Sequence, residues 1–390
     1  MNKLCIDVGY RSLNKHGEQL CGDSIQIVKK NDDSMILVLA DGLGSGVKAS
    51  ILSTLTSKII ATMLANSMTL EDCVSTIAAT LPVCSMRGIA YSTFSIISVN
   101  QNGEAEIIQY DNPMIIFLRD GKNFDYDVQS RIIGNKRIYE SKVRIKQDDV
   151  LIAMSDGAVY AGVGQKLNFG WKRENIIKFI EANYDRRLTA KTITYLITEK
   201  CAELYANKPG DDTTIATIRV REQRNCNLMI GPPANPEDVD RMMSLFFSKE
   251  GYHIVCGGTT STLAAKYLNK KIEIPLDYVD PKIPPTATIE GVDLVTEGVI
   301  TISKVLEYAK NYLDDNSLYS EWSIKQDGAS KIARILFEEA TNISFFVGTA
   351  INPAHQNPDL PIQFNIKISL IEELAKAMKD MGKTVQLNFF

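Results

Sequence analysis

Apolar runs and helical repeats alternate along the first part of the chain. A continuous apolar run from Met35 to Ala40 predicts a buried strand. It is followed by apolar residues at every fourth position, namely Val47, Ile51, Leu55, Ile59 and Met63. This spacing predicts a helix over 45–65 that buries the apolar stripe against its neighbours. A second helix is expected over 69–82, which begins at a capping threonine and stops at a proline.

Residues 92–154 have a different pattern, in which short β-type runs are separated by turn dipeptides. The turn signals include Asn102-Gly103, Asp120-Gly121 and Gly134-Asn135. We interpret this segment as a meander of antiparallel strands. Because helices flank this run of strands, we expect an α+β domain built as a helix-flanked antiparallel β-sandwich, and not an alternating parallel fold.

A polar, charged segment over 221–227 separates this pattern from the rest of the chain. Beyond it, apolar runs lead through glycine turns into helices, as at Ile230-Gly231 and Cys256-Gly257. Strand, glycine turn and helix in this order are typical of an α/β domain. We therefore predict two domains, residues 1–222 and residues 226–390, of which the second is a smaller α/β domain of unknown role.

Composition narrows the class of protein. The formal net charge is −4 and 23% of the residues are charged, so there is no bulk electrostatic case for nucleic acid or an anionic membrane as a partner. The first residues lack the apolar run of a signal peptide, and no continuous run of about 18 apolar residues occurs. The seven cysteines are scattered, as expected for free thiols in a reducing compartment. These features predict a cytoplasmic protein that does not span a membrane.

Four aspartate motifs lie at the ends of predicted strands. They are Gly22-Asp23, Ala40-Asp41-Gly42, Ser155-Asp156-Gly157 and Gly210-Asp211-Asp212. Taken singly, each is more typical of a turn, because Asp bonds its own backbone and Gly accepts a positive φ. Two of the motifs, however, follow continuous apolar runs directly, and the other two lead directly into predicted strands. Because buried strands from distant parts of a chain converge in a sheet, we expect these carboxylates to meet at one rim.

Clustered carboxylates repel one another unless a cation neutralises them. Oxygen ligands without histidine or cysteine favour Mg²⁺, Mn²⁺ or Ca²⁺ over zinc or copper. The only histidines are His16, His253 and His355, and none adjoins the aspartate motifs, which argues against a histidine-based hydrolase. Two divalent ions can activate a bridging water and hold a phosphoryl group during in-line attack. The pattern therefore points to metal-dependent hydrolysis of a phosphate ester.

The order and approximate spacing of three segments resemble those of the type-2C metal-dependent protein phosphatases, in particular the bacterial SpoIIE-like branch. The segments are Leu39-Ala40-Asp41-Gly42-Leu43-Gly44-Ser45-Gly46, Asp148 to Gly157, and Gly210-Asp211-Asp212-Thr213-Thr214. The resemblance covers about residues 1–220. It implies a β-sandwich flanked by helices, with a dinuclear metal site at one rim.

The resemblance also implies roles for individual residues. Asp41 would bridge two Mn²⁺ or Mg²⁺ ions. Asp23, through water, and the Gly42 carbonyl would hold one ion, while Asp156 and Asp211 would hold the other.

Two departures from the better-known eukaryotic pattern leave parts of this site unassigned. Leu43 stands where that pattern has a histidine proposed to protonate the leaving group, and Gln19 stands where it has a phosphate-binding arginine. The leaving-group acid and the phosphate-binding residue are therefore unknown. Asp212 is an ambiguous neighbour of Asp211.

The predicted function is a metal-dependent serine/threonine phosphatase acting on a phosphorylated regulatory protein of a bacterium. Phosphatases of this branch are often switched by accessory domains, so an activating partner is expected. The helix pair over 45–65 and 69–82 begins directly after Asp41-Gly42, which makes it the expected switch element. The alternative function is a non-catalytic module that binds a phosphoprotein or acts as a scaffold.

The second domain has one candidate ligand site. Gly258, Thr259 and Thr260 open a predicted helix, where backbone N–H groups and hydroxyls can receive an anion. A normal turn and helix cap explains the same residues, since they form neither a GxxxxGK[ST] nor a GxGxxG pattern. If a ligand does bind there, the domain would sense a phosphorylated metabolite and set when the phosphatase acts.

Overall fold

The computed structural model describes residues 4–30, 34–80, 92–100, 102–134, 136–274, 284–350 and 366–390. The chain divides into two compact units, the first ending at Glu222 and the second beginning at Gln223. Each unit has a hydrophobic core of its own. The predicted helix stop at Pro82 lies outside the described residues.

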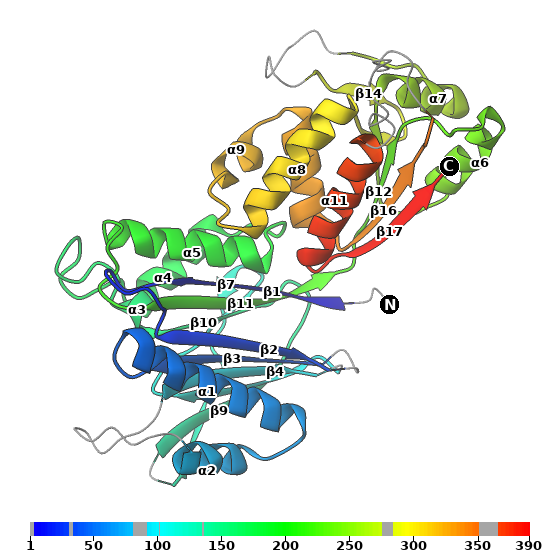
Figure 1. The fold of residues 1–390 in the computed structure, drawn as a ribbon. Coiled ribbons are helices and arrows are strands. Elements are labelled where there is room, and N and C mark those ends of the chain that lie inside the picture. Colours follow the sequence, from blue (N-terminus) through cyan, green and yellow to red (C-terminus); the bar gives the residue numbers. More distant parts are fainter. Residues whose placement is uncertain are drawn as a thin grey trace. The chain divides into compact units, whose positions relative to one another are not determined.

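Two antiparallel sheets form the first unit (Figure 1). The first sheet contains, in spatial order, β1 (Leu4–Leu13), β11 (Thr213–Glu222), β10 (Val150–Met154), β6 (Ile116–Arg119) and β7 (Lys122–Asn123). The second contains β2 (Asp23–Lys29), β3 (Met35–Gly42), β4 (Ser92–Val99), β5 (Glu104–Tyr110), β9 (Lys136–Arg144) and β8 (Gln129–Ile133). Leu37 and Leu39 of one sheet pack with Leu151 and Ile218 of the other in one buried cluster. The predicted β-sandwich is therefore confirmed.

Helices cover the outer faces of both sheets (Figure 1). They are α1 (Gly46–Ala65) and α2 (Leu70–Thr80) on the second sheet, and α3 (Asp156–Val159), α4 (Arg173–Asn183) and α5 (Ala190–Leu204) on the first. Ile193 and Ile197 of α5 pack against Ile152 and Ile215 of the first sheet. The meander predicted between residues 92 and 154 is antiparallel throughout, but its strands are shared between the two sheets.

Helix α1 corrects one expectation. The apolar residues Val47, Ile51 and Leu55, expected to face the sheet, are 61%, 52% and 41% exposed. The buried face instead carries mostly small side chains, namely Gly46, Ala49, Ser53, Thr56, Ser57, Ile60 and Ala61. Small residues let the axis of α1 approach β2 and β3 closely. The side chains that face the sheet therefore share a small size and not a high hydrophobicity.

A mostly parallel sheet organises the second unit. Its strands, in spatial order, are β14 (Ala287–Ile289), β15 (Val292–Thr296), β13 (Tyr252–Cys256), β12 (Asn225–Ile230), β16 (Asn342–Val347) and β17 (Thr384–Phe389). Only β14, at one edge, is antiparallel among these strands. Counted along the chain within this unit, the five parallel strands lie in the order 3-2-1-4-5, a doubly wound arrangement.

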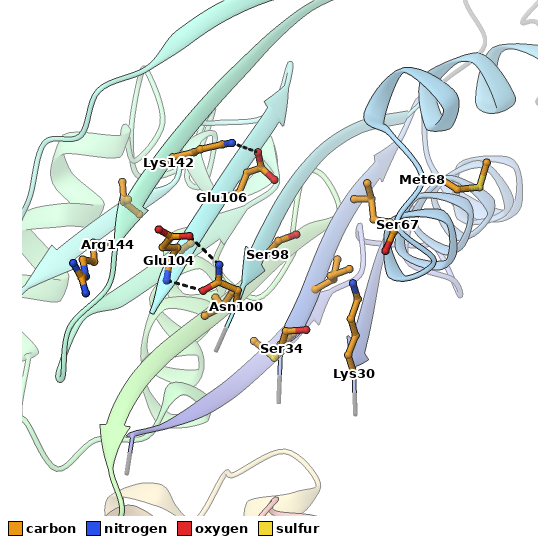
Figure 2. Close-up of a pocket in the computed structure, with 16 residues that line it drawn as sticks. Lys30, Ser34, Ser67, Met68, Ser98, Asn100, Glu104, Glu106, Lys142 and Arg144 are labelled. Carbon is orange, nitrogen blue, oxygen red and sulfur yellow. Dashed lines mark hydrogen bonds and ion pairs between the residues drawn. The ribbon is translucent and has the colours of Figure 1, made fainter. Parts of the chain in front are cut away.

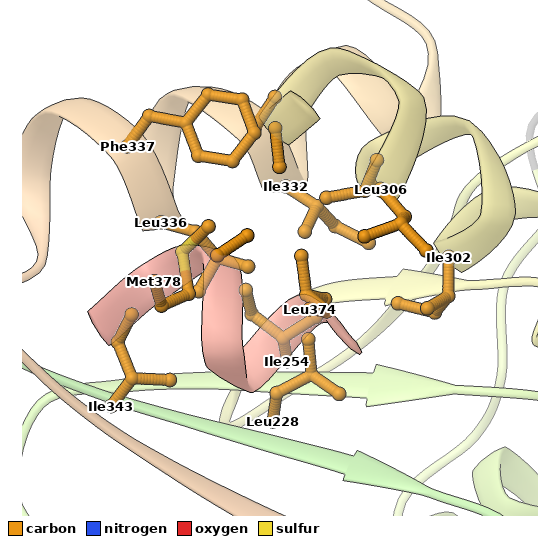
Figure 3. Packing of buried hydrophobic residues seen from close by; sticks show 14 of the residues in the cluster. Leu228, Ile254, Ile302, Leu306, Ile332, Leu336, Phe337, Ile343, Leu374 and Met378 are labelled. Atoms are coloured by element: carbon orange, nitrogen blue, oxygen red, sulfur yellow. The ribbon is translucent and has the colours of Figure 1, made fainter. Parts of the chain in front are cut away.

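Helices pack on both faces of this parallel sheet. They are a 3₁₀ turn (Pro236–Asp238), α6 (Val239–Phe247), α7 (Gly258–Leu268), α8 (Val299–Leu313), α9 (Tyr319–Ile324), α10 (Gly328–Ala333), a π-helical segment (Arg334–Glu339) and α11 (Ile366–Asp380). On one face, Ile302 and Leu374 from the helices meet Leu228 and Ile254 from the strands, as Figure 3 shows. The α/β nature of this part, expected from its glycine turns, is confirmed.

Among the described residues, α1 alone is long and apolar enough in composition to cross a membrane. A third of its most apolar stretch is buried, and helices that pack on a protein core meet the same criterion. All six cysteines in the part of the chain that the structure describes are free thiols.

Candidate active site

The four predicted ligand aspartates come from both sheets of the first unit. Asp23 opens β2 and Asp41 lies near the end of β3, and the antiparallel register places them directly opposite each other. Asp156 opens α3 two residues after β10, and Asp211 lies two residues before β11. The charges of the other three all act on Asp41. The strand ends therefore bring these carboxylates to one rim of the sandwich.

Ser155 connects the two sheets at this rim. Its hydroxyl donates a hydrogen bond to Asp23 Oδ2 over 2.7 Å and accepts one from the Thr214 N–H over 2.8 Å. Ser155 is fully buried, so losing either partner would leave a polar group unsatisfied. The hydroxyl therefore fixes the Asp23 carboxylate of one sheet to the edge of the other.

Two glycines next to the aspartates sit where a side chain has no room. A Cβ atom at Gly42 would lie 2.1 Å from the Ala49 carbonyl oxygen of α1. A Cβ atom at Gly157 would lie 2.1 Å from the Asp212 carbonyl oxygen. Close backbone packing therefore requires glycine after Asp41 and after Asp156. The same contact shows that α1 lies directly against the strand that carries Asp41.

Burial and repulsion by neighbouring charges raise the pKa values of three of these carboxyl groups. Burial, followed by the charges of Asp23, Asp156 and Asp211, raises the pKa of Asp41 to about 9. Burial also raises the pKa of Asp23 to about 6, although hydrogen bonds from hydroxyl groups act in the opposite direction. The pKa of Asp156 is raised by burial and by the charge of Asp211. The set cannot ionise fully near neutral pH unless a cation compensates its charge.

The chemistry of these residues fits a hard divalent cation. Asp23 Oδ1 is buried without a hydrogen-bond partner among the described residues, and the converging ligand atoms are oxygens. Within the same described residues, however, no three carboxylate, histidine or cysteine side chains are arranged to hold one ion. The chain thus supplies suitable ligands at one rim, but not a closed coordination shell.

Asp211 and its neighbour Asp212 differ in their surroundings. Asp212 is 4% exposed, its Oδ1 accepts a hydrogen bond from the Lys15 N–H over 3.0 Å, and its charge acts on Asp23. Asp211 is partly exposed, and its charge acts on Asp41 and Asp156. Asp211 therefore faces the open side of the cluster, whereas Asp212 supports the backbone near Lys15.

The sequence pattern did not predict three further polar residues that lie at this rim. Ser155 directly precedes Asp156, which is the one sequence signal that marks it. Lys15 places its Nζ atom 3.9 Å from Asp211 Oδ1. The Cys21 thiol lies beside Asp23, and burial together with that charge raises its pKa to about 12, so it stays protonated and is a poor nucleophile. Nothing near Lys15 or Cys21 in the sequence distinguishes them from surface residues.

The predicted anion site lies at the start of α7 in the second unit. Gly258 and Thr259 are exposed, whereas Thr260 is buried. The N-cap, Gly257, has a φ of 102° and makes no side-chain capping hydrogen bond. This arrangement suits an ordinary helix start as well as an anion site, so ligand binding there stays a prediction.

Comparison with known families identifies the first unit. The family model for stage II sporulation protein E (SpoIIE) matches residues 31–221. The matched region includes Asp41, Asp156 and Asp211, and it begins after Asp23. A search among curated proteins finds no match.

Solved structures with similar folds were also found. The phosphatase domain of the cell-fate determinant SpoIIE from Bacillus subtilis is 18% identical, with a TM-score of 0.43, over 57% of this chain and 95% of that one. A longer structure, with a fragment of the SpoIIE regulatory domain, is 19% identical, with a TM-score of 0.49, over 57% of this chain and 65% of that one. RsbX, solved in complex with magnesium, is 18% identical, with a TM-score of 0.40, over 56% of this chain and all of that one (100%).

The family match, the antiparallel sandwich and the order of the aspartate motifs agree with one another. PP2C-type phosphatases, to which SpoIIE belongs, depend on metal ions. Residues 31–221 are thus a SpoIIE-type domain, which supports a protein phosphatase.

Proposed function

We propose that this chain removes phosphate from phosphoserine or phosphothreonine in a bacterial regulatory protein, using two Mn²⁺ or Mg²⁺ ions. The proposed ligands are Asp23, Asp41, the Gly42 carbonyl, Asp156 and Asp211. The observation that supports this most strongly is the meeting of four carboxylates at a partly buried rim, where burial and neighbouring charges raise the pKa values of Asp23, Asp41 and Asp156. Two bound divalent ions would supply an activated water and neutralise the phosphoryl oxygens.

The protein's own residues position this chemistry. The charges of the other three aspartates all act on Asp41, so it is the group best placed to lie between two cations. Ser155 holds Asp23 by a hydrogen bond across the two sheets. The Gly42 backbone lies in close contact with Ala49 of α1, and its N–H donates a hydrogen bond to the Gly22 carbonyl over 3.1 Å.

Lys15 is our candidate for binding the substrate phosphate. Its Nζ atom lies 3.9 Å from a carboxylate oxygen of Asp211, and both side chains are partly exposed. A solvent-facing ammonium at this distance is held only weakly, so it is free to turn towards a phosphate dianion. Gln19, at the position expected for an arginine, is exposed and uncharged.

The test is hydrolysis of p-nitrophenyl phosphate by the full chain with Mn²⁺, with Mg²⁺ and with a chelator. We expect activity only with metal, and a loss of at least about a hundredfold in Asp41→Ala and in Asp156→Ala, since even outer-shell changes at metal sites cost about 10–100-fold. Asp127→Ala, which removes an exposed aspartate, is the matched control. Activity that survives chelation, or that is equal in all four proteins, would refute the dinuclear site.

We also propose that the second unit regulates the first, that an activating partner contributes, and that the protein acts in the cytoplasm. The exposed first turn of α7, at Gly258 and Thr259, supports an anion as the signal. Thermal melting of the full chain with inorganic phosphate tests this, and Gly258→Glu should abolish any stabilisation. An equal phosphate effect in both proteins would contradict the assignment.

A further inference from the structure

A groove of about 780 Å³ on the second sheet of the first unit has charged side chains that match one another. Figure 2 shows Glu106 facing Lys142, and these two side chains form an ion pair over 3.7 Å. Glu104 accepts a hydrogen bond from the Asn100 amide over 3.0 Å and lies opposite Arg144 in the register of β5 and β9. These charges therefore indicate no ligand for the groove.

The edges of the sheets differ in how they are protected against pairing with a further strand. Among the described residues, the edge strands are β1, β7, β2, β8, β14 and β17. Native proteins protect such edges with charged side chains or with short strands. Strands β1, β2 and β8 carry charges, such as Arg11, Lys29 and Arg131, while β7 and β14 have only two and three residues. Strand β17 has six residues without a charge or a proline, and its register with β16 is unbroken.

The backbone of β17 has one open side. On its other side, the Phe390 N–H that follows the strand donates a hydrogen bond to the Val347 carbonyl of β16 over 2.9 Å. Because backbone groups alternate in direction along a strand, Val385, Leu387 and Phe389 direct their N–H and C=O groups away from β16. No strand in the described part of the chain pairs with that side, and the Phe389 side chain is 47% exposed.

This edge is complementary to itself. The side chains of Val385, Leu387 and Phe389 share one face of the sheet, on which Val385 and Leu387 pack against the core that α11 helps to form. In an antiparallel pair of two β17 strands with Leu387 opposite its own copy, Val385 lies opposite Phe389. The outward backbone groups then face each other and make about six hydrogen bonds, and apolar side chains meet on one face. A shift of one residue would place Gln386 opposite Leu387 and lose these bonds.

Helix α11 fits the same arrangement. It connects β16 to β17 and packs on both strands, through contacts of its buried face with Phe345 and Leu387 (Figure 1). Its axis therefore lies over the gap between these strands, half a strand spacing inside the edge. Across a twofold axis between two β17 strands, the two α11 axes are about 10 Å apart at about 4.8 Å per strand. Packed helices in proteins are about 8–10 Å apart, so the two copies of α11 would contact each other without a clash.

The charges on α11 also suit a second copy. Glu373 forms an ion pair with Lys310 of α8 over 2.7 Å. Glu372 and Lys379 are exposed, lie two helical turns apart, and belong to no ion pair among the described residues. Because the twofold axis makes the two helices antiparallel, Glu372 of one copy approaches Lys379 of the other.

A segment of the same chain is a poorer match for this edge. Residues 351–365, which connect β16 to α11, lie outside the described residues. Their sequence includes Pro353, Pro358 and Pro361, and proline has no N–H to donate to a ladder. A second β17 has an N–H group at every position and is the better-matched occupant.

We propose that β17 pairs with the β17 of a second copy of this chain, antiparallel and across a twofold axis at Leu387. Two six-stranded sheets then form one continuous sheet. Both copies use the same surface, so the association closes at a dimer. The proposal stands on the second unit alone and is independent of the phosphatase function.

Sedimentation of the full chain at micromolar concentrations, in chelator, tests the pairing. We expect a dimer whose dissociation constant rises at least about tenfold in Phe389→Lys, because the lysine must lose water beside Val385 of the other copy. Phe169→Lys makes the same change at an exposed phenylalanine of the first unit and should dimerise as the native chain does. A monomeric native chain, a series of larger species, or equal weakening in both variants overturns the proposal.

Charge reversal on α11 tests the arrangement of the two helices. Glu372→Lys should weaken the dimer about threefold to tenfold, since it removes two symmetry-related exposed ion pairs and adds repulsion. Adding Lys379→Glu to this variant restores opposite charges across the axis and should return the dissociation constant to the native value. A double variant that dimerises as weakly as Glu372→Lys overturns the antiparallel placement of α11.

Discussion

The rim of the first unit and the main core of the second unit bury different kinds of groups. At the rim of the sandwich, Asp23 is 7% and Asp212 is 4% exposed, and no hydrogen-bond partner for one oxygen of each is found among the described residues. In the second unit, the largest buried cluster is built from hydrocarbon and aromatic side chains, such as Trp322 and Phe337. Buried apolar groups stabilise a fold, whereas buried like charges oppose it. The buried carboxylates therefore indicate a functional site, whereas the buried apolar cluster stabilises the fold.

Helices α1 and α8 also differ in how far they bury their apolar residues. Both have regularly spaced apolar residues in sequence, yet Ile51 of α1 is 52% exposed and Ile302 of α8 is fully buried. The small residues of α1 bring it close to the strands that carry the aspartates. The buried face of α1 is therefore the face that packs closely on the strands, and not the most apolar face.

The largest expected effect distinguishes these two helices. Ile302→Ala should lower the free energy of unfolding by about 2–5 kcal/mol, because it leaves a cavity in a packed core. Ile51→Ala should change it by less than about 0.5 kcal/mol, since the side chain already faces solvent. Urea unfolding of the two variants gives both values. Similar losses in the two proteins would mean that α1 does bury its apolar stripe.

A smaller effect is expected at the hydroxyl that joins the two sheets. Ser155→Ala removes the hydrogen bond that lowers the pKa of Asp23, so more metal is needed to keep this carboxyl ionised. The Mn²⁺ concentration for half-maximal hydrolysis should rise about 10–100-fold. Ser141→Ala, at another buried serine, is the control. An unchanged metal requirement would show that Ser155 only stabilises the fold.

Removing a charge from the rim should stabilise the metal-free protein. Asp41→Asn is expected to raise the free energy of unfolding in chelator by about 1–3 kcal/mol while abolishing activity. Because the folded-state pKa of Asp41 is raised to about 9 from 3.8, the folded chain binds more protons, and its stability falls as pH rises through that window.

Unfolding of both proteins in urea at pH 5 and pH 8 measures this effect. The native chain should lose more stability between the two pH values than Asp41→Asn does. Asp127→Asn, on the surface, should follow the native curve. Destabilisation of Asp41→Asn at pH 8 would mean that the carboxylates do not repel one another.

The smallest expected effect concerns substrate binding. Lys15→Met should raise KM for a phosphoserine peptide about threefold to tenfold with little change in kcat, because an exposed cation contributes about 1 kcal/mol to binding a phosphate. Lys122→Met removes another exposed lysine and serves as the control. A fall in kcat at constant KM would instead assign Lys15 to the chemical step.

Much of the fold followed from local pattern. The apolar run ending at Asp41 and the turn dipeptides of the meander predicted strands of the sandwich, which the structure contains. The glycine turns after Ile230 and Cys256 predicted an α/β domain, and the structure has a mostly parallel sheet with helices there. Strands β14 and β15 were missed because they are short and polar residues interrupt their apolar pattern.

The residues of the candidate site divide in the same way. The sequence by itself determined which carboxylates stand at strand ends, because Asp-Gly motifs after apolar runs are local features. Only the tertiary structure decided that Ser155 bonds to Asp23, 132 positions away, and that Lys15 approaches Asp211. It also decided which face of α1 is buried, because helical spacing shows that a stripe exists but not which stripe the neighbouring strands can accommodate. Long-range packing sets these contacts, and no local pattern encodes them.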